Sequence, residues 1–223
     1  MSKAKVRKVA VLLAAAMVAV LLGGCGLSFD ASGYVKALLD NSYKGDSAEF
    51  VAQKVGTKQQ AEELYNQGID TEMKSLTSQA NVSEELQGEF REVLQNIFKN
   101  VKYTVGEAAK KDDSYEVEVK YQKMKIFEPA IESFNTTSQD YINGITEKPE
   151  NGEESPSEEE LNEEIFTLLK DALINAMDDV SFGDEESTVI HVELKDNTWM
   201  PNEADVQNLE KLLFDMEVLE ELQ

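Results

Sequence analysis

The start of the chain is its most constraining feature, because it decides which residues can take part in the fold. The first eight residues include four lysine or arginine side chains and no acid, and a continuous apolar run follows over residues 9–22. At about 14 residues this run is too short to cross a bilayer, which needs on the order of 20 apolar residues. A basic start, a short apolar run and small residues after it are typical of a secretory signal peptide, which is removed from the mature protein. We therefore predict a signal peptide over residues 1–24 and a fold that begins after it.

The apolar run ends in the tetrad Leu22, Gly23, Gly24 and Cys25. This tetrad resembles the lipobox of bacterial lipoproteins, and the resemblance implies that the Cys25 thiol is diacylated and that Cys25 becomes the first mature residue. Residues 25–29 are then the lipidated cysteine and a short tether, which reaches about 15 Å when extended. Two acyl chains hold a protein stably on a membrane. The resemblance therefore predicts a lipid-anchored protein on the extracytoplasmic face of the cell membrane, with an uncleaved transmembrane anchor or a free buried thiol as the alternatives.

Cys25 is also the only cysteine of the chain. Once its sulfur carries lipid, no thiol is left for a disulfide, a redox pair or a nucleophile. The exported domain must therefore be held together by its apolar core.

The charge of the chain limits its partners. The sequence has 21 basic and 44 acidic residues, and loss of the four basic residues of the signal leaves 17 against 44, a net charge of about −27. Such a surface repels the phosphates of nucleic acids, anionic lipids and anionic wall polymers. We expect no nucleic-acid partner, and the charge favours a basic or wall-associated protein. Two other interpretations of the same charge are that it only keeps the protein soluble, or that it binds divalent cations weakly.

Helical periodicity covers most of the mature chain. Capping residues and apolar positions spaced three and four apart predict helices over about 30–45, 47–55, 57–79, 83–97, 129–148, 157–180 and 201–219. Between two of these helices, residues 148–157 are polar and acidic and contain two prolines, so we expect an exposed loop there and not a domain boundary. The three glutamates at 158–160 are explained by helix initiation, because the helix dipole favours acids in the first turn.

The apolar period changes from 3.6 to 2 near residue 101, which predicts strands. Alternation over about 103–109 and 115–126 indicates a hairpin, and a last strand is expected over 187–195, followed by a turn at Asp196 and Asn197. Trp199 and Met200, after that turn, are expected to pack against the rest of the fold. The predicted fold is a single α+β domain over residues 30–223, with about six helices around a small antiparallel sheet of about three strands.

The mature part resembles lipoproteins of unassigned function from Gram-positive bacteria. The likeness is carried by residues 29–45, which resemble the entry helix of those proteins, with the matching positions Asp30, Tyr34, Leu38, Asp40 and Gly45. Helices that precede a curved hairpin are also similar to the cystatin-like or NTF2-like group. That group usually has four or more strands, whereas this sequence shows about three. The resemblance implies no established activity.

The sequence offers few groups for chemistry. It has one histidine, His191, and no cysteine besides Cys25, so a zinc site is not expected. His191 is expected to be a surface or cross-strand residue. The chain has no Walker loop, dinucleotide fingerprint or Gly-x-Ser-x-Gly elbow. An acidic segment near 178–186 lacks the alternating carboxylates of an EF-hand loop. We therefore expect no catalytic residue, no metal ligand and no cofactor.

These observations favour a membrane-anchored, extracytoplasmic lipoprotein that acts as a non-catalytic binding or assembly module. The alternative is a hydrolase of wall glycan or peptide that works through carboxylates. With 44 acidic residues, any fold places some carboxylate pair at a suitable separation by chance, so such a pair alone does not discriminate between the two functions. A deep cleft with a close carboxylate pair would favour the enzyme, and a shallow groove or an exposed apolar patch would favour the module.

Overall fold

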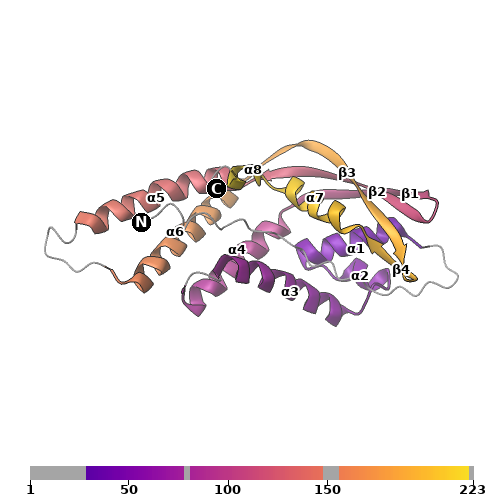
Figure 1. Ribbon diagram of the computed structural model, residues 1–223, viewed down its shortest axis with the longest axis horizontal. Coiled ribbons are helices and arrows are strands. Elements are labelled where there is room, and N and C mark those ends of the chain that lie inside the picture. The colour runs from indigo at the N-terminus through magenta and orange to yellow at the C-terminus, as the bar shows by residue number, and fades with distance from the viewer. Residues whose placement is uncertain (1–28, 78–80, 148–155, 221–223) are drawn as a thin grey trace.

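The computed structural model describes residues 29–77, 81–147 and 156–220 (Figure 1). The predicted signal peptide, Cys25 and most of the predicted loop at 148–157 lie outside these residues. The elements follow one another as α1 Ala31–Lys44, α2 Ala48–Ala52, α3 Lys58–Thr77, α4 Glu84–Lys99, β1 Lys102–Lys111, β2 Ser114–Lys125, α5 Phe127–Glu147, α6 Glu158–Asp178, β3 Ser181–Lys195, β4 Thr198–Pro201, α7 Glu203–Leu213 and α8 Glu217–Glu220.

The four strands form one open antiparallel sheet in the order β1-β2-β3-β4. Alternate residues of the two central strands, such as Val117 and Val119 of β2 and Ile190 and Val192 of β3, are fully buried on one face. Helices α1 and α7 lie on the sheet, and α3 and α4 pack beneath α1 (Figure 1). The predicted α+β class and single domain are confirmed.

The first helix is fixed at both ends by residues that the sequence analysis singled out. The Asp30 carboxylate accepts a hydrogen bond from the Gly33 backbone at 2.9 Å and caps the N-terminus. At the other end Gly45 adopts a left-handed conformation with φ of 63° and donates its N–H to the helix. Between them the fully buried Tyr34 donates its hydroxyl to the Trp199 carbonyl at 3.0 Å, which ties α1 to β4.

Asp40 is a buried charge near the middle of the body. Its carboxylate pairs with Lys36 and Lys44 and accepts the Tyr103 hydroxyl at 2.7 Å. Burial by itself would raise the pKa of Asp40, but the hydrogen bonds from Lys36 and Tyr103 and the neighbouring lysine charges outweigh it and hold the pKa below its usual value. The ionised form of Asp40 therefore belongs to the folded state.

The sheet has one more strand than predicted. Trp199 and Met200, expected to pack, and Pro201, expected to begin the last helix, belong to β4, which pairs with β3. Asp196 and Asn197 have positive φ in the predicted turn. A strand of four residues is too short to show an apolar alternation with a period of 2, so the sequence pattern does not predict β4. Leu194, near the end of β3, is 46% exposed and does not join the core.

Strand β3 begins earlier than predicted, at residue 181 instead of 187. The acidic residues of this extension have low strand propensity, and pairing with β2 overrides it. Glu185 lies 3.7 Å from the Lys120 ammonium, and Glu186 accepts the Tyr121 hydroxyl at 3.2 Å. Contacts from β2 therefore stabilise a strand that the local sequence alone does not predict.

The C-terminal helix predicted to reach residue 219 instead ends at Leu213. Phe214 is extended and fully buried, with its ring 6.2 Å from Phe98 and 5.9 Å from Phe127. The next residue, Asp215, caps α5 from a distance: its carboxylate accepts the backbone N–H groups of residues 126, 127 and 128 at 3.2, 3.0 and 2.9 Å. Helix α7 therefore ends before Phe214 and Asp215, because the first packs in the core and the second caps α5.

Candidate functional site

The most distinctive surface is the hairpin of α5 and α6, which we call the arm. It extends away from the sheet along the long axis of the molecule (Figure 1). The two helices pack on each other, α6 also touches α4, and α5 touches α8 at its base. Each helix has 21 residues, so the arm is about 30 Å long at 1.5 Å of rise per residue.

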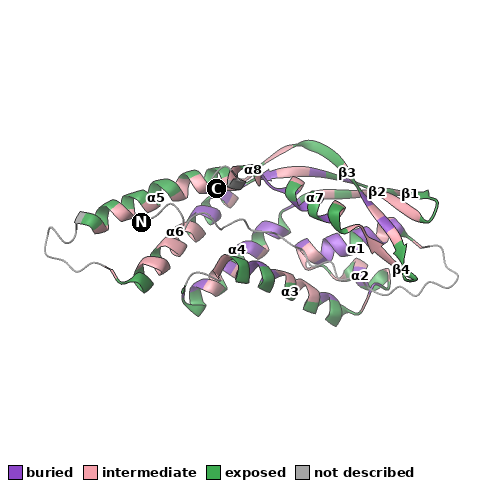
Figure 2. Cartoon of the chain, in the orientation of Figure 1, coloured by how far each residue is buried: buried purple, intermediate pink, exposed green. Residues whose placement is uncertain are grey.

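The apolar side chains of the arm are only partly covered. Figure 2 shows intermediate and exposed residues along most of both helices, with buried ones towards the base. Eight apolar residues of the hairpin are half-buried and lie outside the main core: Ile131, Phe134, Tyr141, Ile142, Ile145, Leu161, Ile165 and Leu168. Ile174 of α6 is 40% exposed as well. The arm thus carries an apolar seam that water still reaches.

The arm is strongly acidic. Its two helices contain a single basic residue, Lys170, and eleven acidic residues: Glu128, Glu132, Asp140, Glu147, Glu158, Glu159, Glu160, Glu163, Glu164, Asp171 and Asp178. Burial raises the pKa of Tyr141, and the charges of Glu164 and Glu160 raise it further. The half-buried seam therefore lies in a field of negative charge.

Helix α6 is attached to the body by polar and aromatic contacts with the start of α4. The Glu163 carboxylate accepts the Ser83 backbone N–H at 2.8 Å and also the Ser83 hydroxyl, and these bonds lower the pKa of Glu163. Lys170 donates to Glu89 at 2.5 Å, and the rings of Phe90 and Phe166 meet edge to face at 5.8 Å. These contacts fix α6 and leave α5 on the outer side of the arm.

The other end of the molecule holds the start of the described chain. Phe29, the first described residue, stacks on Trp199 with ring centroids 4.7 Å apart and planes 5° from parallel, and it meets Tyr115 edge to face at 5.5 Å. Trp199 belongs to β4, beside the turn from β3, at the end of the long axis opposite the arm (Figure 1). The chain therefore enters the body far from the arm.

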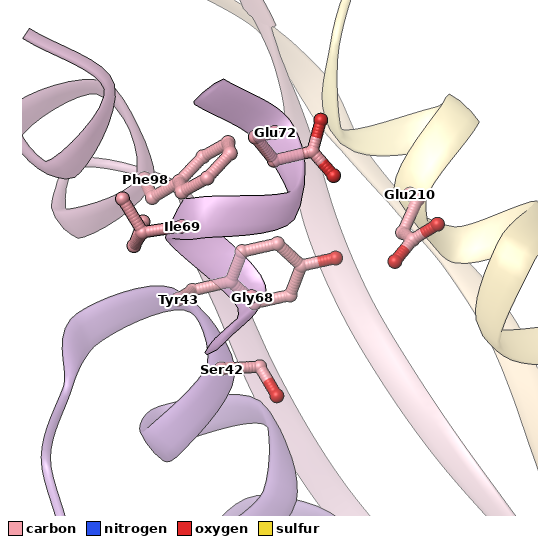
Figure 3. A pocket seen from close by; sticks show the side chains of 7 residues that line it. All are labelled: Ser42, Tyr43, Gly68, Ile69, Glu72, Phe98 and Glu210. Carbon is pink, nitrogen blue, oxygen red and sulfur yellow. The ribbon is translucent and has the colours of Figure 1, made fainter. Parts of the chain in front are cut away.

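A small cavity lies between α1, α3 and α7 (Figure 3). It is lined by Ser42, Tyr43, Gly68, Ile69, Glu72, Phe98 and Glu210 and has a volume of about 20 Å³. Tyr43, Glu72 and Glu210 are only 4%, 3% and 6% exposed. Burial raises the pKa of Tyr43, and the charges of Glu210 and Glu72 raise it further. The phenol is therefore neutral in the folded protein.

A wider groove of about 350 Å³ runs over the surface between α3 and α4. Its lining is mixed and includes Met73, Lys74 and the ion pair of Asp70 with Arg91. The groove is open, and its charges of both signs are arranged as ordinary surface contacts.

His191 is a cross-strand residue, as predicted. It faces Glu116 of β2 at 3.9 Å, and its Nδ1 lies 2.7 Å from the Asp205 carboxylate of α7. The same carboxylate accepts the His191 backbone N–H at 2.9 Å. Asp205 thus joins the start of α7 to the sheet, which is a structural role.

Residues 29–77, 81–147 and 156–220 contain no group of three or more histidine, cysteine, aspartate or glutamate side chains placed to hold a metal ion. No helix among them has the length and the apolar character needed to span a bilayer.

The predicted site residues Leu22, Gly23, Gly24 and Cys25 fall outside the described part of the chain, so lipidation at Cys25 stays a prediction. The sequence analysis explained the glutamates at 158–160 as helix initiation, and the capping box of Ser157 with Glu160 confirms this. The acidic character of the whole arm was not predicted. The signal for it was present in the sequence, because residues 127–147 and 156–169 contain no lysine or arginine.

No protein-family model matches the chain, and no curated protein matches it in sequence. Among solved structures, the fold is similar to that of the ycdA protein of Bacillus subtilis subsp. subtilis str. 168, which is provisionally described as a lipoprotein. The TM-score is 0.58 at 15% sequence identity, and the match covers 83% of this chain and 56% of that protein. The chain thus spans a little over half the length of its structural neighbour. The likeness shows a shared fold with a protein from a Gram-positive bacterium, and the predicted cystatin-like or NTF2-like relationship stays a prediction.

Proposed function

We propose that this protein is a lipid-anchored, non-catalytic module on the extracytoplasmic face of the cell membrane, and that its arm binds a basic protein partner. The observation that carries the proposal is the composition of the arm: its two helices combine a half-buried apolar seam with eleven acidic residues and one basic residue. Apolar surface that stays partly open and is rimmed by polar groups is typical of interaction sites.

The placement of the arm supports this role. The predicted anchor at Cys25 is four residues from Phe29, which stacks on Trp199 at the opposite end of the body. A tether of about 15 Å keeps that end close to the bilayer. The arm then points away from the membrane, where a protein of the wall or of the cell surface can reach it.

Charge selects the class of partner. A second copy of the chain would bring two acidic arms together, which costs free energy through like-charge repulsion. A partner that places lysine or arginine around an apolar ridge, such as a basic amphipathic helix, complements both the seam and its rim. The acidic field of the arm would also speed the encounter with such a partner.

The hydrolase alternative receives less support. The buried carboxylates Glu72 and Glu210 line a cavity of about 20 Å³, which holds one water-sized molecule and no sugar ring or peptide. The wide groove between α3 and α4 has no deep enclosure that would separate two carboxyl groups from water.

Photocrosslinking in living cells tests the proposed binding function. A photoreactive phenylalanine derivative replaces Tyr141, which is half-buried in the seam of the arm, and a matched control replaces Val51 of α2, which is 45% exposed. We expect the arm position to capture a basic protein that the α2 position does not capture. Capture of lipid and self only, or the same proteins at both positions, would contradict the proposal.

The anchor is tested separately by metabolic labelling with a palmitate analogue. The wild-type protein is expected to carry the label and to fractionate with membranes. Cys25→Ser is expected to lose the label and to leave the membrane fraction. An unlabelled wild-type protein would refute the anchor and leave the crosslinking test of the arm unaffected.

A further inference from the structure

We infer that the cavity between Tyr43, Glu72 and Glu210 is a binding site for a single calcium ion. The inference concerns a site far from the seam of the arm, and it stands or falls independently of the proposed partner. It rests on three features of the cavity: its orphaned hydroxyl group, its oxygen-only polar lining and its size.

The hydroxyl of Tyr43 is the first feature. The side chain is 4% exposed, and its oxygen has no hydrogen-bond partner among the described residues. In Figure 3 the hydroxyl points into the space between the carboxyl groups of Glu72 and Glu210. A buried hydroxyl without a partner lowers the stability of the fold, so an occupant that takes its oxygen as a ligand is favoured.

The second feature is the chemistry of the lining. The polar groups are two carboxylates, a phenol and the hydroxyl of Ser42, and none of the described residues that line the cavity is basic. Oxygen donors of this kind select hard cations such as calcium, magnesium and sodium. Two carboxylates match a divalent ion in charge, and the neutral phenol of Tyr43 adds a further oxygen.

Size separates calcium from magnesium. A volume of about 20 Å³ accommodates one water-sized occupant. Magnesium keeps several of its waters and demands octahedral geometry, whereas calcium accepts irregular shells built from bidentate carboxylates. The cavity has no room for a hydrated magnesium ion, so calcium is the better occupant.

The site would join three segments that are distant in sequence. Tyr43 lies in the last turn of α1, Glu72 belongs to α3 and Glu210 to α7. Of these helices, α1 and α7 contact the sheet directly, and α3 packs on α1. An ion held among them therefore links the outer helical layer to the body, and calcium should raise the stability of the whole domain.

Terbium luminescence tests the site with the full chain purified in mild detergent and stripped with a chelator. Terbium binds calcium sites and emits when a neighbouring tyrosine is excited. We expect sensitised emission that calcium displaces and magnesium does not displace, together with a rise in melting temperature on addition of calcium alone. Glu210→Gln is expected to weaken calcium binding at least tenfold and to abolish that rise. Tyr43→Phe is expected to remove most of the emission.

The matched control is Glu203→Gln, an exposed glutamate on the same helix as Glu210. This control is needed because a chain of net charge −23 collects divalent cations loosely over its surface. Glu203→Gln is expected to behave as wild type in both measurements. Equal effects of calcium on the wild type and both glutamine variants, equal displacement by magnesium, or no effect of calcium at all would overturn the inference and leave a water molecule as the occupant.

Discussion

Replacement of Asp215 by alanine should loosen the base of the arm. The Asp215 carboxylate is 4% exposed and accepts three backbone N–H groups at the start of α5, at 3.2, 3.0 and 2.9 Å. These groups have no partner within the helix, because the first turn of every helix leaves its N–H groups unsatisfied. Asp215 therefore caps the N-terminus of α5, although it lies near the other end of the sequence.

The magnitude follows from the surroundings of the three donors. Loss of an ordinary N-cap costs about 0.5–2 kcal/mol, and a buried donor left without an acceptor costs about 1–3 kcal/mol. Ile126 is fully buried, so water cannot replace the lost acceptor of its N–H, whereas the donors of residues 127 and 128 are only part-buried. We expect Asp215→Ala to lower the free energy of unfolding by about 3 kcal/mol, which corresponds to roughly 6–12 °C in melting temperature for a domain of this size.

Urea denaturation followed by circular dichroism measures the loss, and hydrogen exchange locates it. The amides of residues 126–128 and of Ala130 should exchange faster in the variant than those of α1. The control is Asp140→Ala, an exposed residue of the same helix, which should change stability by no more than about 0.5 kcal/mol. A loss below about 1 kcal/mol for Asp215→Ala, or equal effects of the two substitutions, would refute the reasoning.

Two further predictions concern α1. Because the folded protein holds the pKa of Asp40 below its unfolded value, the stabilisation is present above about pH 4 and is lost as the pH falls through the folded pKa. Urea midpoints of wild type and Asp40→Asn should therefore converge between about pH 5 and pH 2, and a pH-independent difference would contradict this. Gly45→Ala should destabilise by about 1–2 kcal/mol, because φ is 63° and the added Cβ would lie 3.1 Å from the Tyr65 ring. Gly144→Ala in α5 meets no atom within 4 Å and should stabilise by up to about 1 kcal/mol, so thermal melts that shift both variants in the same direction would refute the argument.

Local signals in the sequence were sufficient wherever a residue acts on its own neighbours. Ser83 and Ser157 cap the helices that follow them, as predicted, and Thr57 exchanges hydrogen bonds with Gln60 at 2.8 and 3.2 Å. The alternation over β2 places Val117, Val119 and Tyr121 in the core. Each of these outcomes depends on spacings of two to four residues, which periodicity records directly.

The failures concern partners that are far apart in the chain. Asp215 caps a helix that begins about 90 residues earlier in the chain. The apolar spacing over 201–219 does not reveal this distant contact, so it predicts one continuous helix. The acidic start of β3 depends on Lys120 and Tyr121 of another strand. The cavity brings together Tyr43, Glu72 and Glu210 from three helices. No local sequence pattern predicts that side chains from three helices meet, because tertiary packing determines it.

The most direct test of the proposed function compares capture by the arm before and after its charge is reduced. Glu132→Gln, Asp140→Asn and Glu164→Gln together neutralise exposed acids of the arm. A control variant carries the same number of changes on the body, at three exposed positions: Glu92→Gln, Glu107→Gln and Asp113→Asn. With the photoreactive group at position 141, we predict that the arm variant captures much less of the basic partner, whereas the body variant captures as much as the original chain. Equal capture by both variants would contradict the claim that the acidic arm is the binding surface.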